Sequence, residues 1–281
     1  MLPTNRSIMI DHLKKQRLLA HIDELARNDC LLAFSGGADS ALVLALLANA
    51  VKNSGKRLFA IYIRTALMPV RDESFAQKMA QSLDVSYEVL TVNEWEEPAI
   101  IRNGPDRCYH CKRKLFMTLR EKALALGVEQ VIDGTNHDDL QSYRPGLKAI
   151  EELRILSPLA HCEMMKKDVR AYLGQLGLEV AKRPSSPCLA TRIPYGTALE
   201  LPLLHQIEAA EHYLISLGCY NVRVRLHGDV ARIEVDEKDM SVVMAHRHQI
   251  LERFNALGFL YVSLDLKGFR SGSLDEKIVQ A

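Results

Sequence analysis

A short loop between two apolar segments combines glycine, serine and aspartate in a pattern that can bind phosphate. It reads Ser35-Gly36-Gly37-Ala38-Asp39-Ser40. The apolar residues 31–34 before it predict a buried strand, and the apolar residues 41–50 after it predict a helix. Backbone N–H groups and the positive end of the helix dipole then face one point, glycines let an anion approach, and serine hydroxyls can donate. A phosphate repels a carboxylate unless a divalent cation lies between them, so we interpret Asp39 as a Mg²⁺ ligand. The alternative is a tight turn without a ligand, which a glycine pair alone would favour.

Three of the six cysteines have the spacing or surroundings of metal ligands. Cys108 and Cys111 form a Cys-x-x-Cys pair on the expected connection between the third strand and the next helix, and Cys188 lies in a loop rich in proline and serine. Such a pair can chelate a metal, form a redox disulfide or help to hold an iron–sulfur cluster. If this loop folds over the glycine loop, three thiolates could hold a [4Fe-4S] cluster with one iron open to a non-protein ligand. Zinc held by these cysteines and His110 is the alternative. The other cysteines are expected to be small apolar residues: Cys30, Cys162 and Cys219.

Arginines in the C-terminal part of the chain could bind a phosphate or a carboxylate. Arg223 and Arg225 are two residues apart on an expected strand, so they project from the same face. Arg232 lies on the expected partner strand, and Arg270 follows the last expected strand, between glycines. Arginine binds such oxygens in a bidentate manner. The alternative is a solvated strand face on which the arginines pair with acidic neighbours such as Glu234.

Strands and helices alternate in the first part of the chain. We expect strands at residues 31–34, 58–63, 87–92 and 130–133, and helices at residues 7–27, 41–50, 71–83, 114–126 and 166–176. This order predicts a doubly wound α/β domain with a parallel sheet. Ligands bind such sheets beyond the carboxyl ends of the strands, where the glycine loop, Arg64 and residues 133–139 all lie. In the last of these, Asn136 and Asp139 are candidates for contacts with a ribose or a metal, and a helix N-cap is the compatible alternative.

The pattern changes after residue 200. A helix is expected at residues 203–217, a hairpin at 221–226 and 230–235, a helix at 238–257 and a strand at 260–266, which together make a small α+β domain. We therefore divide the chain into an α/β domain with the phosphate-binding loop (1–181), a linker with Cys188 (182–200), an α+β substrate-binding domain (201–271) and a tail (272–281).

Composition limits the partners of the protein. The 281 residues carry a formal net charge of +1, so no overall field attracts nucleic acid or a membrane. The longest apolar run, residues 41–50, is too short to span a bilayer, and the first residues lack the apolar core of a signal peptide. We expect a cytoplasmic protein, and we also expect it to form homo-oligomers.

The glycine loop resembles the PP-loop of the ATP pyrophosphatases, which grip the pyrophosphate of ATP and transfer AMP to an oxygen of the substrate. Residues 133–139 resemble the Gly-x-Asn-x-x-Asp loops that these enzymes place beside ATP. Four further blocks resemble the LarE family: residues 143–149, 192–197, 223–234 and 268–272. Members of that family are ATP-dependent sulfur transferases of nickel-pincer nucleotide biosynthesis.

This resemblance implies a reaction and a set of site residues. With ATP and Mg²⁺, a carboxylate of pyridinium-3,5-biscarboxylic acid mononucleotide would be adenylated, pyrophosphate released and sulfur inserted to give a thiocarboxylate. By motif position, Arg223, Arg225 and Arg270 would hold the phosphate of the substrate. Lys112 and Arg192 would lie nearby, and Glu211 and Glu234 match acidic positions that could bind a metal.

The family has two sulfur sources, and the resemblance divides them by cysteine content. One form sacrifices a cysteine at the position of Cys188 and lacks the Cys-x-x-Cys pair. The other resembles cluster-bearing transferases, in which the open iron is thought to carry a sulfide. Because Cys108 and Cys111 are present, we expect the cluster form, with a [4Fe-4S] cofactor and an external sulfide donor.

Two other functions fit part of the pattern. A tRNA 2-thiolation enzyme can also combine a PP-loop with three cluster cysteines, but its substrate requires a long basic surface. A nucleotide-binding or iron–sulfur sensing module without turnover is the second alternative.

Overall fold

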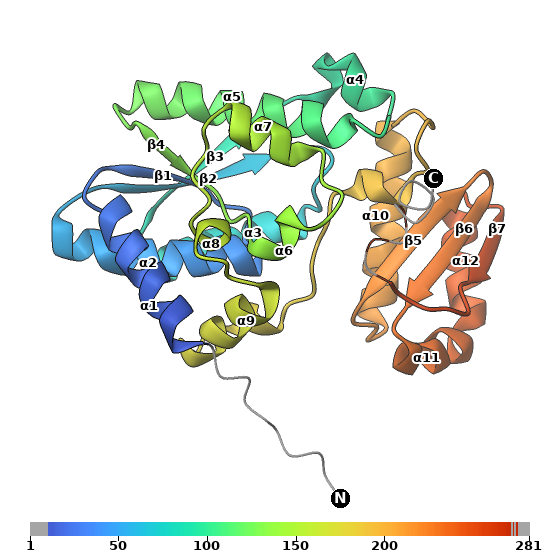
Figure 1. Cartoon of the computed structure of the whole chain (residues 1–281). Helices are drawn as coiled ribbons and strands as arrows, with labels where there is room; N and C mark the ends of the chain where they lie inside the picture. The colour runs from blue at the N-terminus through green and yellow to red at the C-terminus, as the bar shows by residue number, and fades with distance from the viewer. Residues whose placement is uncertain (1–10, 271, 273, 275–281) are drawn as a thin grey trace, which may run out of the picture. The chain divides into compact units, whose positions relative to one another are not determined.

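The computed structural model describes residues 11–270 together with Gly272 and Leu274. It consists of two compact units (Figure 1). The first comprises Met1–Thr65, Val70–Asn93 and Cys108–Ser186, and the second comprises Ala66–Pro69, Glu94–Arg107 and Pro187–Ala281. Two short segments from the N-terminal half thus group with the C-terminal unit, which the sequence did not suggest. The division into an ATP-binding and a substrate-binding domain stays a prediction, and most of the predicted tail lies outside the described residues.

The first unit is built on a parallel sheet. Its strands are β1 (Cys30–Ala33), β2 (Leu58–Arg64), β3 (Ser86–Thr91) and β4 (Gln130–Ile132). They lie in the order β3-β2-β1-β4, and every pairing is parallel. The predicted α/β class with a parallel sheet is therefore confirmed.

Helices cover both faces of this sheet (Figure 1). On one face lie α1 (His12–Leu25), α2 (Ala38–Ser54), α3 (Arg71–Ser82) and α9 (Lys166–Gln175), and on the other lie α5 (Arg107–Ala125) and α7 (Gly146–Glu152). Leu32 packs into the apolar cluster of the first face, whereas its neighbour Leu31 packs with Phe116 and Ile150 on the second. Successive strand residues point to opposite faces, so a sheet covered on both sides requires a continuous apolar run. Short elements complete the unit: α6 (His137–Leu140), α8 (Pro158–His161) and the 3₁₀ turn η2 (Glu179–Lys182).

The second unit contains a small mixed sheet. Strands β5 (Val222–His227) and β6 (Val230–Val235) form the predicted antiparallel hairpin, and β7 (Tyr261–Leu264) pairs parallel to β6. The remaining elements are η1 (Glu94–Glu96), α4 (Pro98–Ile101), η3 (Leu189–Arg192), α10 (Leu201–Ser216), η4 (Glu237–Asp239), α11 (Met240–Ala245) and α12 (Arg247–Ala256). Helix α10 packs against β5 and α12. A small α+β unit was expected here, and it is present.

Two of the predicted helices differ most from the structure in their limits. Helix α5 begins at Arg107 rather than at residue 114, so the Cys-x-x-Cys pair lies in the first turns of a helix and not on a connection. The buried Arg107 donates hydrogen bonds to the Asn103 side chain and, at 3.3 Å, to the carbonyl of Ala190, which fixes the start of the helix. These tertiary contacts outweigh the modest helix propensity of cysteine, tyrosine and histidine. The helix expected at residues 238–257 is instead divided into η4, α11 and α12.

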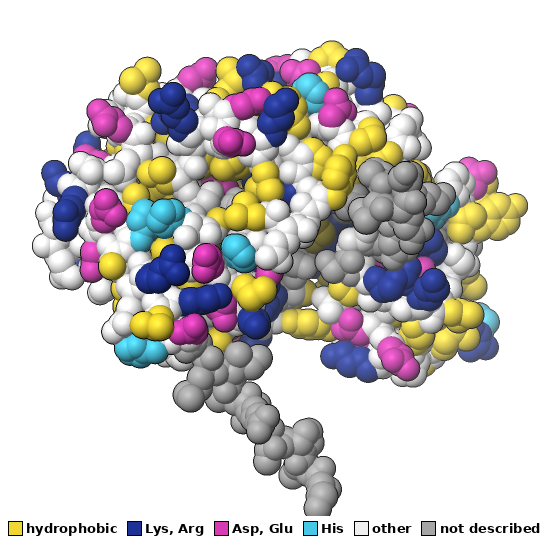
Figure 2. Space-filling model, in the orientation of Figure 1, with side chains coloured by type: hydrophobic (Ala, Val, Ile, Leu, Met, Phe, Trp, Pro, Cys, Tyr) yellow, Lys and Arg dark blue, Asp and Glu magenta, His cyan; other side chains and the backbone are white. Residues whose placement is uncertain are grey.

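The surface carries charges of both signs. On the face shown in Figure 2, basic and acidic side chains are interspersed among the described residues and do not gather into one patch of one sign. Within the part of the chain that the structure describes, no helix is long and apolar enough to span a membrane.

Candidate active site

The loop after β1 presents an uncapped helix N-terminus. Gly37 is the N-cap of the 17-residue helix α2, and because it has no side chain, the first N–H groups of the helix stay available to an anion. The Ser35 and Ser40 hydroxyls lie 3.1 Å apart, and the Gly37 N–H donates to Ser35 Oγ at 3.4 Å. The predicted phosphate-binding arrangement of backbone amides and hydroxyls is thus present in one loop.

The loop after β4 touches this phosphate loop. A Cβ atom on Gly134 would lie 2.6 Å from the backbone nitrogen of Ser40, so only glycine fits there. Strands β1 and β4 are neighbours, while β2 lies on the other side of β1. The connections therefore diverge between β1 and β4, and a crevice at such a switch point is where open α/β sheets bind ligands.

Asp39 has one carboxylate oxygen in an ion pair and one without a partner. Its Oδ2 pairs with Nζ of Lys166, the first residue of α9, while its Oδ1 is buried and accepts no hydrogen bond from any described residue. The Lys166 N–H donates to Asp138 Oδ2 at 2.7 Å, which holds α9 against the loop after β4. An orphaned buried oxygen is unfavourable, and a hard cation such as Mg²⁺ prefers this type of ligand. The residues present thus fit the predicted metal role of Asp39. Lys166 was not among the site residues predicted from the sequence, because no local motif marks it.

Asn136 and Asp139 form a reciprocal helix cap. The Asp139 N–H donates to the Asn136 side chain and the Asn136 N–H donates to the Asp139 carboxylate, both at 3.2 Å, at the start of α6. Asp139 also pairs with Arg144 at 2.8 Å. The capping interpretation is confirmed, and a contact of either residue with ATP stays a prediction.

Arg64 lies at the end of β2, but its guanidinium is directed to a helix. It donates to both oxygens of Glu73 on α3, at 2.7 and 2.6 Å. This hydrogen bonding holds the pKa of the Glu73 carboxyl below its usual value and raises the pKa of Arg64. Contact of Arg64 with ATP remains a prediction, and it would require the side chain to leave Glu73.

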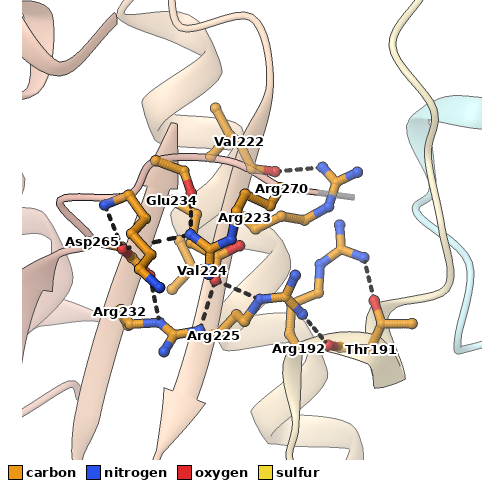
Figure 3. A network of polar contacts seen from close by, with 12 residues as sticks. Thr191, Arg192, Val222, Arg223, Val224, Arg225, Arg232, Glu234, Asp265 and Arg270 are labelled. Carbon is orange, nitrogen blue, oxygen red and sulfur yellow. Dashed lines mark hydrogen bonds and ion pairs between the residues drawn. The ribbon is translucent and has the colours of Figure 1, made fainter. Parts of the chain in front are cut away.

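Arginines and a glutamate share one face of the second sheet. Arg223 is paired across the hairpin with Glu234, and Arg225 is paired with Arg232, so all four side chains project to the same side. Figure 3 shows them close to one another and to Arg270, which comes from the segment after β7. The prediction that Arg223 and Arg225 share a face is confirmed.

Glu234 organises two of these arginines. It is fully buried, and its Oε1 accepts from Arg225 Nε and Arg232 Nη2, both at 2.7 Å. Its Oε2 is buried without a partner among the described residues. Arg225 also donates to the Thr191 carbonyl at 2.7 Å, so this ion pair reaches the segment that follows Cys188.

Arg192 lies inside the protein rather than at the surface. Its side chain is fully buried and donates to both oxygens of Glu211, at 2.8 and 2.9 Å. It also donates to the carbonyls of Pro187 at 2.8 Å and Cys188 at 3.1 Å. The structure thus places Arg192 against the Cys188 backbone, and Glu211 holds the guanidinium in that position.

Arg270 is positioned by a glycine turn. Gly268 has φ +67, and a Cβ atom there would lie 2.9 Å from the Val235 carbonyl, so glycine lets the chain cross the end of β6. The Phe269 N–H donates to that same carbonyl at 2.8 Å, and the Phe269 ring lies 5.0 Å from the guanidinium of Arg223. The Arg270 side chain is 31% exposed and lies 4.0 Å from Asp265.

The predicted cluster ligands are divided between the two units. Cys108 and Cys111 are three residues apart on α5, which places them on neighbouring positions of one helix face. Lys112 follows them and lies 3.8 Å from Asp133 at the end of β4. Cys188 belongs to the second unit. Among the described residues, no group of three or more His, Cys, Asp or Glu side chains is placed to hold a metal ion, so the iron–sulfur cluster stays a proposal.

The other cysteines behave as apolar residues. Cys30, Cys162 and Cys219 are buried, and burial raises the pKa of each thiol, that of Cys30 to about 12. A thiol with a raised pKa is a poor ligand and a poor nucleophile, as expected for these three positions.

Comparison with known proteins agrees with this geometry. The profile of the PP-loop domain family matches residues 10–141. An uncharacterized protein of Synechocystis sp. is 38% identical over 269 residues, which cover 95% of this chain and 98% of the relative. The pyridinium-3,5-bisthiocarboxylic acid mononucleotide synthase of Lactiplantibacillus plantarum is 35% identical over 268 residues, which cover 95% of this chain and 96% of the synthase. The tRNA-specific 2-thiouridylase MnmA of Renibacterium salmoninarum is 26% identical over 197 residues, which cover 56% of this chain and 51% of that protein. Near full-length similarity, together with the ATP-binding PP-loop, shows that this chain belongs to the LarE family of ATP-dependent sulfur-insertion enzymes.

Proposed function

We propose that this enzyme acts on pyridinium-3,5-biscarboxylic acid mononucleotide. The observation that carries the proposal is the similarity to the Lactiplantibacillus plantarum synthase, which extends over 95% of the chain. That relative is named for a product with two thiocarboxylates, and we infer that the substrate here has carboxylates at those positions. The same reaction is our proposal for this chain.

ATP would make the carboxylate reactive. A carboxylate oxygen attacks the α-phosphorus of ATP, the bond from that phosphorus to the bridging oxygen breaks, and pyrophosphate leaves. A sulfur nucleophile then adds to the acyl carbon and AMP leaves with its electron pair. Ser35, Gly36, Gly37 and Ser40 would bind the pyrophosphate portion of ATP. Asp39 would hold Mg²⁺, which neutralises phosphate charge when it is bound.

We assign the contacts with the other parts of ATP to residues at the carboxyl ends of β2 and β4. We assign Asn136, Asp139 and Arg64 to this role because the first two follow β4 and Arg64 is the last residue of β2. Asp139 and Arg64 already pair with Arg144 and Glu73, so each would have to exchange this partner for ATP.

The second sheet would hold the phosphate of the substrate. Arg223, Arg225 and Arg270 are the proposed ligands, and Arg270 is the most accessible because nearly a third of its side chain is exposed. Glu234 fixes Arg225. We also propose that the Lys112 ammonium lies near the bound substrate.

We assign different roles to Glu211 and Glu234. Both oxygens of Glu211 are bonded to Arg192, so we assign it to hold that arginine rather than a metal or the substrate. Glu234 has one buried oxygen without a partner among the described residues, which supports a contact with a ligand cation or proton donor.

For the sulfur source, we propose a [4Fe-4S] cluster held by Cys108, Cys111 and Cys188. The support is the Cys-x-x-Cys pair on one helix face and the half-buried Cys188 in a loop held by arginines. The alternative is that Cys188 gives up its own sulfur. Anaerobic iron and acid-labile sulfide analysis of the wild type and of Cys108→Ala tests the cluster. Mass spectrometry of the Cys188 peptide after turnover tests the alternative, because a consumed cysteine loses the mass of one hydrogen sulfide molecule.

Release of pyrophosphate tests the proposed substrate. With ATP and Mg²⁺, release should require the biscarboxylic acid mononucleotide. A pyridinium mononucleotide with amides in place of both carboxylates should give none. Release that is independent of the carboxylates would contradict the proposal.

A tRNA substrate has less support. The 2-thiouridylase relative matches 56% of the chain at 26% identity, and the net charge is +1. The face in Figure 2 shows no extended basic surface among its described residues, which tRNA binding would require.

A further inference from the structure

Arg183 contacts the PP-loop from a segment far away in the sequence. Its guanidinium donates to the Gly36 carbonyl at 3.3 Å and to Asp72 Oδ1 at 3.0 Å, and it lies 3.8 Å from the ring centre of Phe75. Asp72 and Phe75 belong to the first two turns of α3. Arg183 therefore connects the phosphate loop with a helix on the same side of the sheet, and all of these residues lie in the first unit.

The carbonyl that Arg183 holds determines the direction of a loop amide. None of the described peptide bonds is cis. In a trans peptide the C=O of one residue and the N–H of the next point in opposite directions, so a hydrogen bond to Gly36 O fixes the direction of Gly37 N–H. That N–H points to Ser35 Oγ at 3.4 Å, on the inner side of the loop. Gly36 has φ +71, in the left-handed region that glycine adopts easily. Because glycine has no side chain, the orientation of this peptide depends on contacts from elsewhere in the protein.

Arg183 is in turn held by α9. Arg170 on that helix donates to the main-chain carbonyls of Ala181 and, at 2.9 Å, of Arg183. The same helix begins with Lys166, which pairs with Asp39. Helix α9 thus restrains the PP-loop at two points, one through Asp39 and one through Gly36.

We propose that Arg183 is a positioning residue of the ATP site. It holds the Gly36–Gly37 peptide so that the Gly37 N–H faces into the loop before ATP arrives, and Asp72 and Phe75 hold the guanidinium. A preorganised amide binds an anion without reorganisation. The alternative role is direct contact of the Arg183 guanidinium with an ATP phosphate. The test below distinguishes this role from positioning.

The test is calorimetric binding of ATP with Mg²⁺, in the absence of any mononucleotide, so its result does not depend on the proposed substrate. Arg183→Ala should weaken binding about tenfold or more, as expected for the loss of charge-assisted hydrogen bonds. Arg183→Lys should weaken it similarly, because one ammonium cannot replace a fork that bridges Gly36 O and Asp72. Asp72→Asn should also weaken binding, since it loosens the guanidinium.

Arg57 provides a matched control. It pairs with Asp29 at 2.6 Å, donates to the Leu126 carbonyl at 3.3 Å and lies 5.3 Å from the Phe59 ring centre, so it makes the same three kinds of contact. It precedes β2, at the opposite edge of the sheet from the PP-loop, and Arg57→Ala should leave ATP affinity unchanged.

Three results would overturn the proposal. Unchanged ATP affinity in Arg183→Ala would remove any role for the residue. Wild-type ATP affinity in Arg183→Lys would show that a positive charge alone is enough for ATP binding. Tighter binding in Asp72→Asn would show that Asp72 competes with phosphate for a directly binding Arg183. If Arg183→Ala does not fold, the Lys and Asp72→Asn variants decide the question.

Discussion

Arg192 is fully buried and donates to both carboxylate oxygens of Glu211, at 2.8 and 2.9 Å. The Glu211 Oε1 also accepts from the Val224 N–H at 2.9 Å, which ties α10 to β5. Because the same guanidinium donates to the Cys188 carbonyl, the pair connects the core of the second unit to the backbone of a cysteine that we assign to sulfur transfer.

Breaking this pair should destabilise the protein strongly. Arg192→Met leaves the Glu211 charge buried without its partner, and such a loss typically costs about 3–5 kcal/mol of unfolding free energy. Urea unfolding measures it. The control is Lys148→Met, which removes a pair with Glu152 whose side chains are 71% and 40% exposed and which should change stability by less than about 1 kcal/mol. Equal effects of the two substitutions would contradict the buried role of Arg192.

Asp39→Asn should slow adenylation strongly without unfolding the protein. The substitution removes the charge that pairs with Lys166 and that we assign to Mg²⁺. Loss of one transition-state-stabilising group lowers kcat by on the order of 10²–10³. Pyrophosphate release is the readout, and Asp29→Asn, at the opposite edge of the sheet, is the control. Normal release by Asp39→Asn would remove the metal role.

Arg270→Ala should raise the KM for the mononucleotide and leave ATP affinity unchanged. Loss of a charge-assisted hydrogen bond to phosphate corresponds to about 1.5–3 kcal/mol, or roughly tenfold or more in KM. Arg225→Ala should in addition lower stability, since it leaves the fully buried Glu234 with one arginine fewer. If ATP affinity falls in Arg270→Ala instead, the arginine face belongs to the nucleotide site.

Most of the fold was predictable because its cause is local. The apolar run of β1 and the glycine-marked turns gave the strands, and their alternation with helices gave the parallel sheet. The start of α5 was not predictable, because it depends on hydrogen bonds from Arg107 to Asn103 and Ala190, the latter 83 residues away.

The candidate site was predictable only where one segment carries it. The PP-loop and the Arg223–Arg225 spacing are such cases. Lys166 and Arg183 were missed because each reaches the loop from more than a hundred residues away, as a lysine at a helix start and an arginine in a proline-rich connection. Arg192 was expected near the substrate, and only the structure shows that its buried guanidinium donates to both carboxylate oxygens of Glu211.

Alkylation should divide the six cysteines into two groups. Burial raises the pKa of Cys30 to about 12 from an ordinary value of 9.0, and also raises the pKa of Cys162 and Cys219. A raised pKa lowers the thiolate fraction at every pH below it, and the thiolate is the reactive form. At pH 8, iodoacetamide should therefore modify the half-buried Cys108, Cys111 and Cys188 of the folded, cluster-free protein and leave the other three unmodified. Peptide mass spectrometry reads the result, and denaturation in urea should make all six reactive. Early labelling of Cys30 would contradict its burial.

The central claim is that this chain replaces a carboxylate oxygen of the mononucleotide with sulfur at the expense of ATP. Liquid chromatography with mass spectrometry of an anaerobic reaction containing protein, ATP, Mg²⁺, sulfide and pyridinium-3,5-biscarboxylic acid mononucleotide tests it most directly. We predict a product heavier than the substrate by the difference between one sulfur and one oxygen, formed together with AMP and pyrophosphate, and absent without ATP. ATP cleaved to AMP and pyrophosphate with no sulfur in the mononucleotide would contradict the claim.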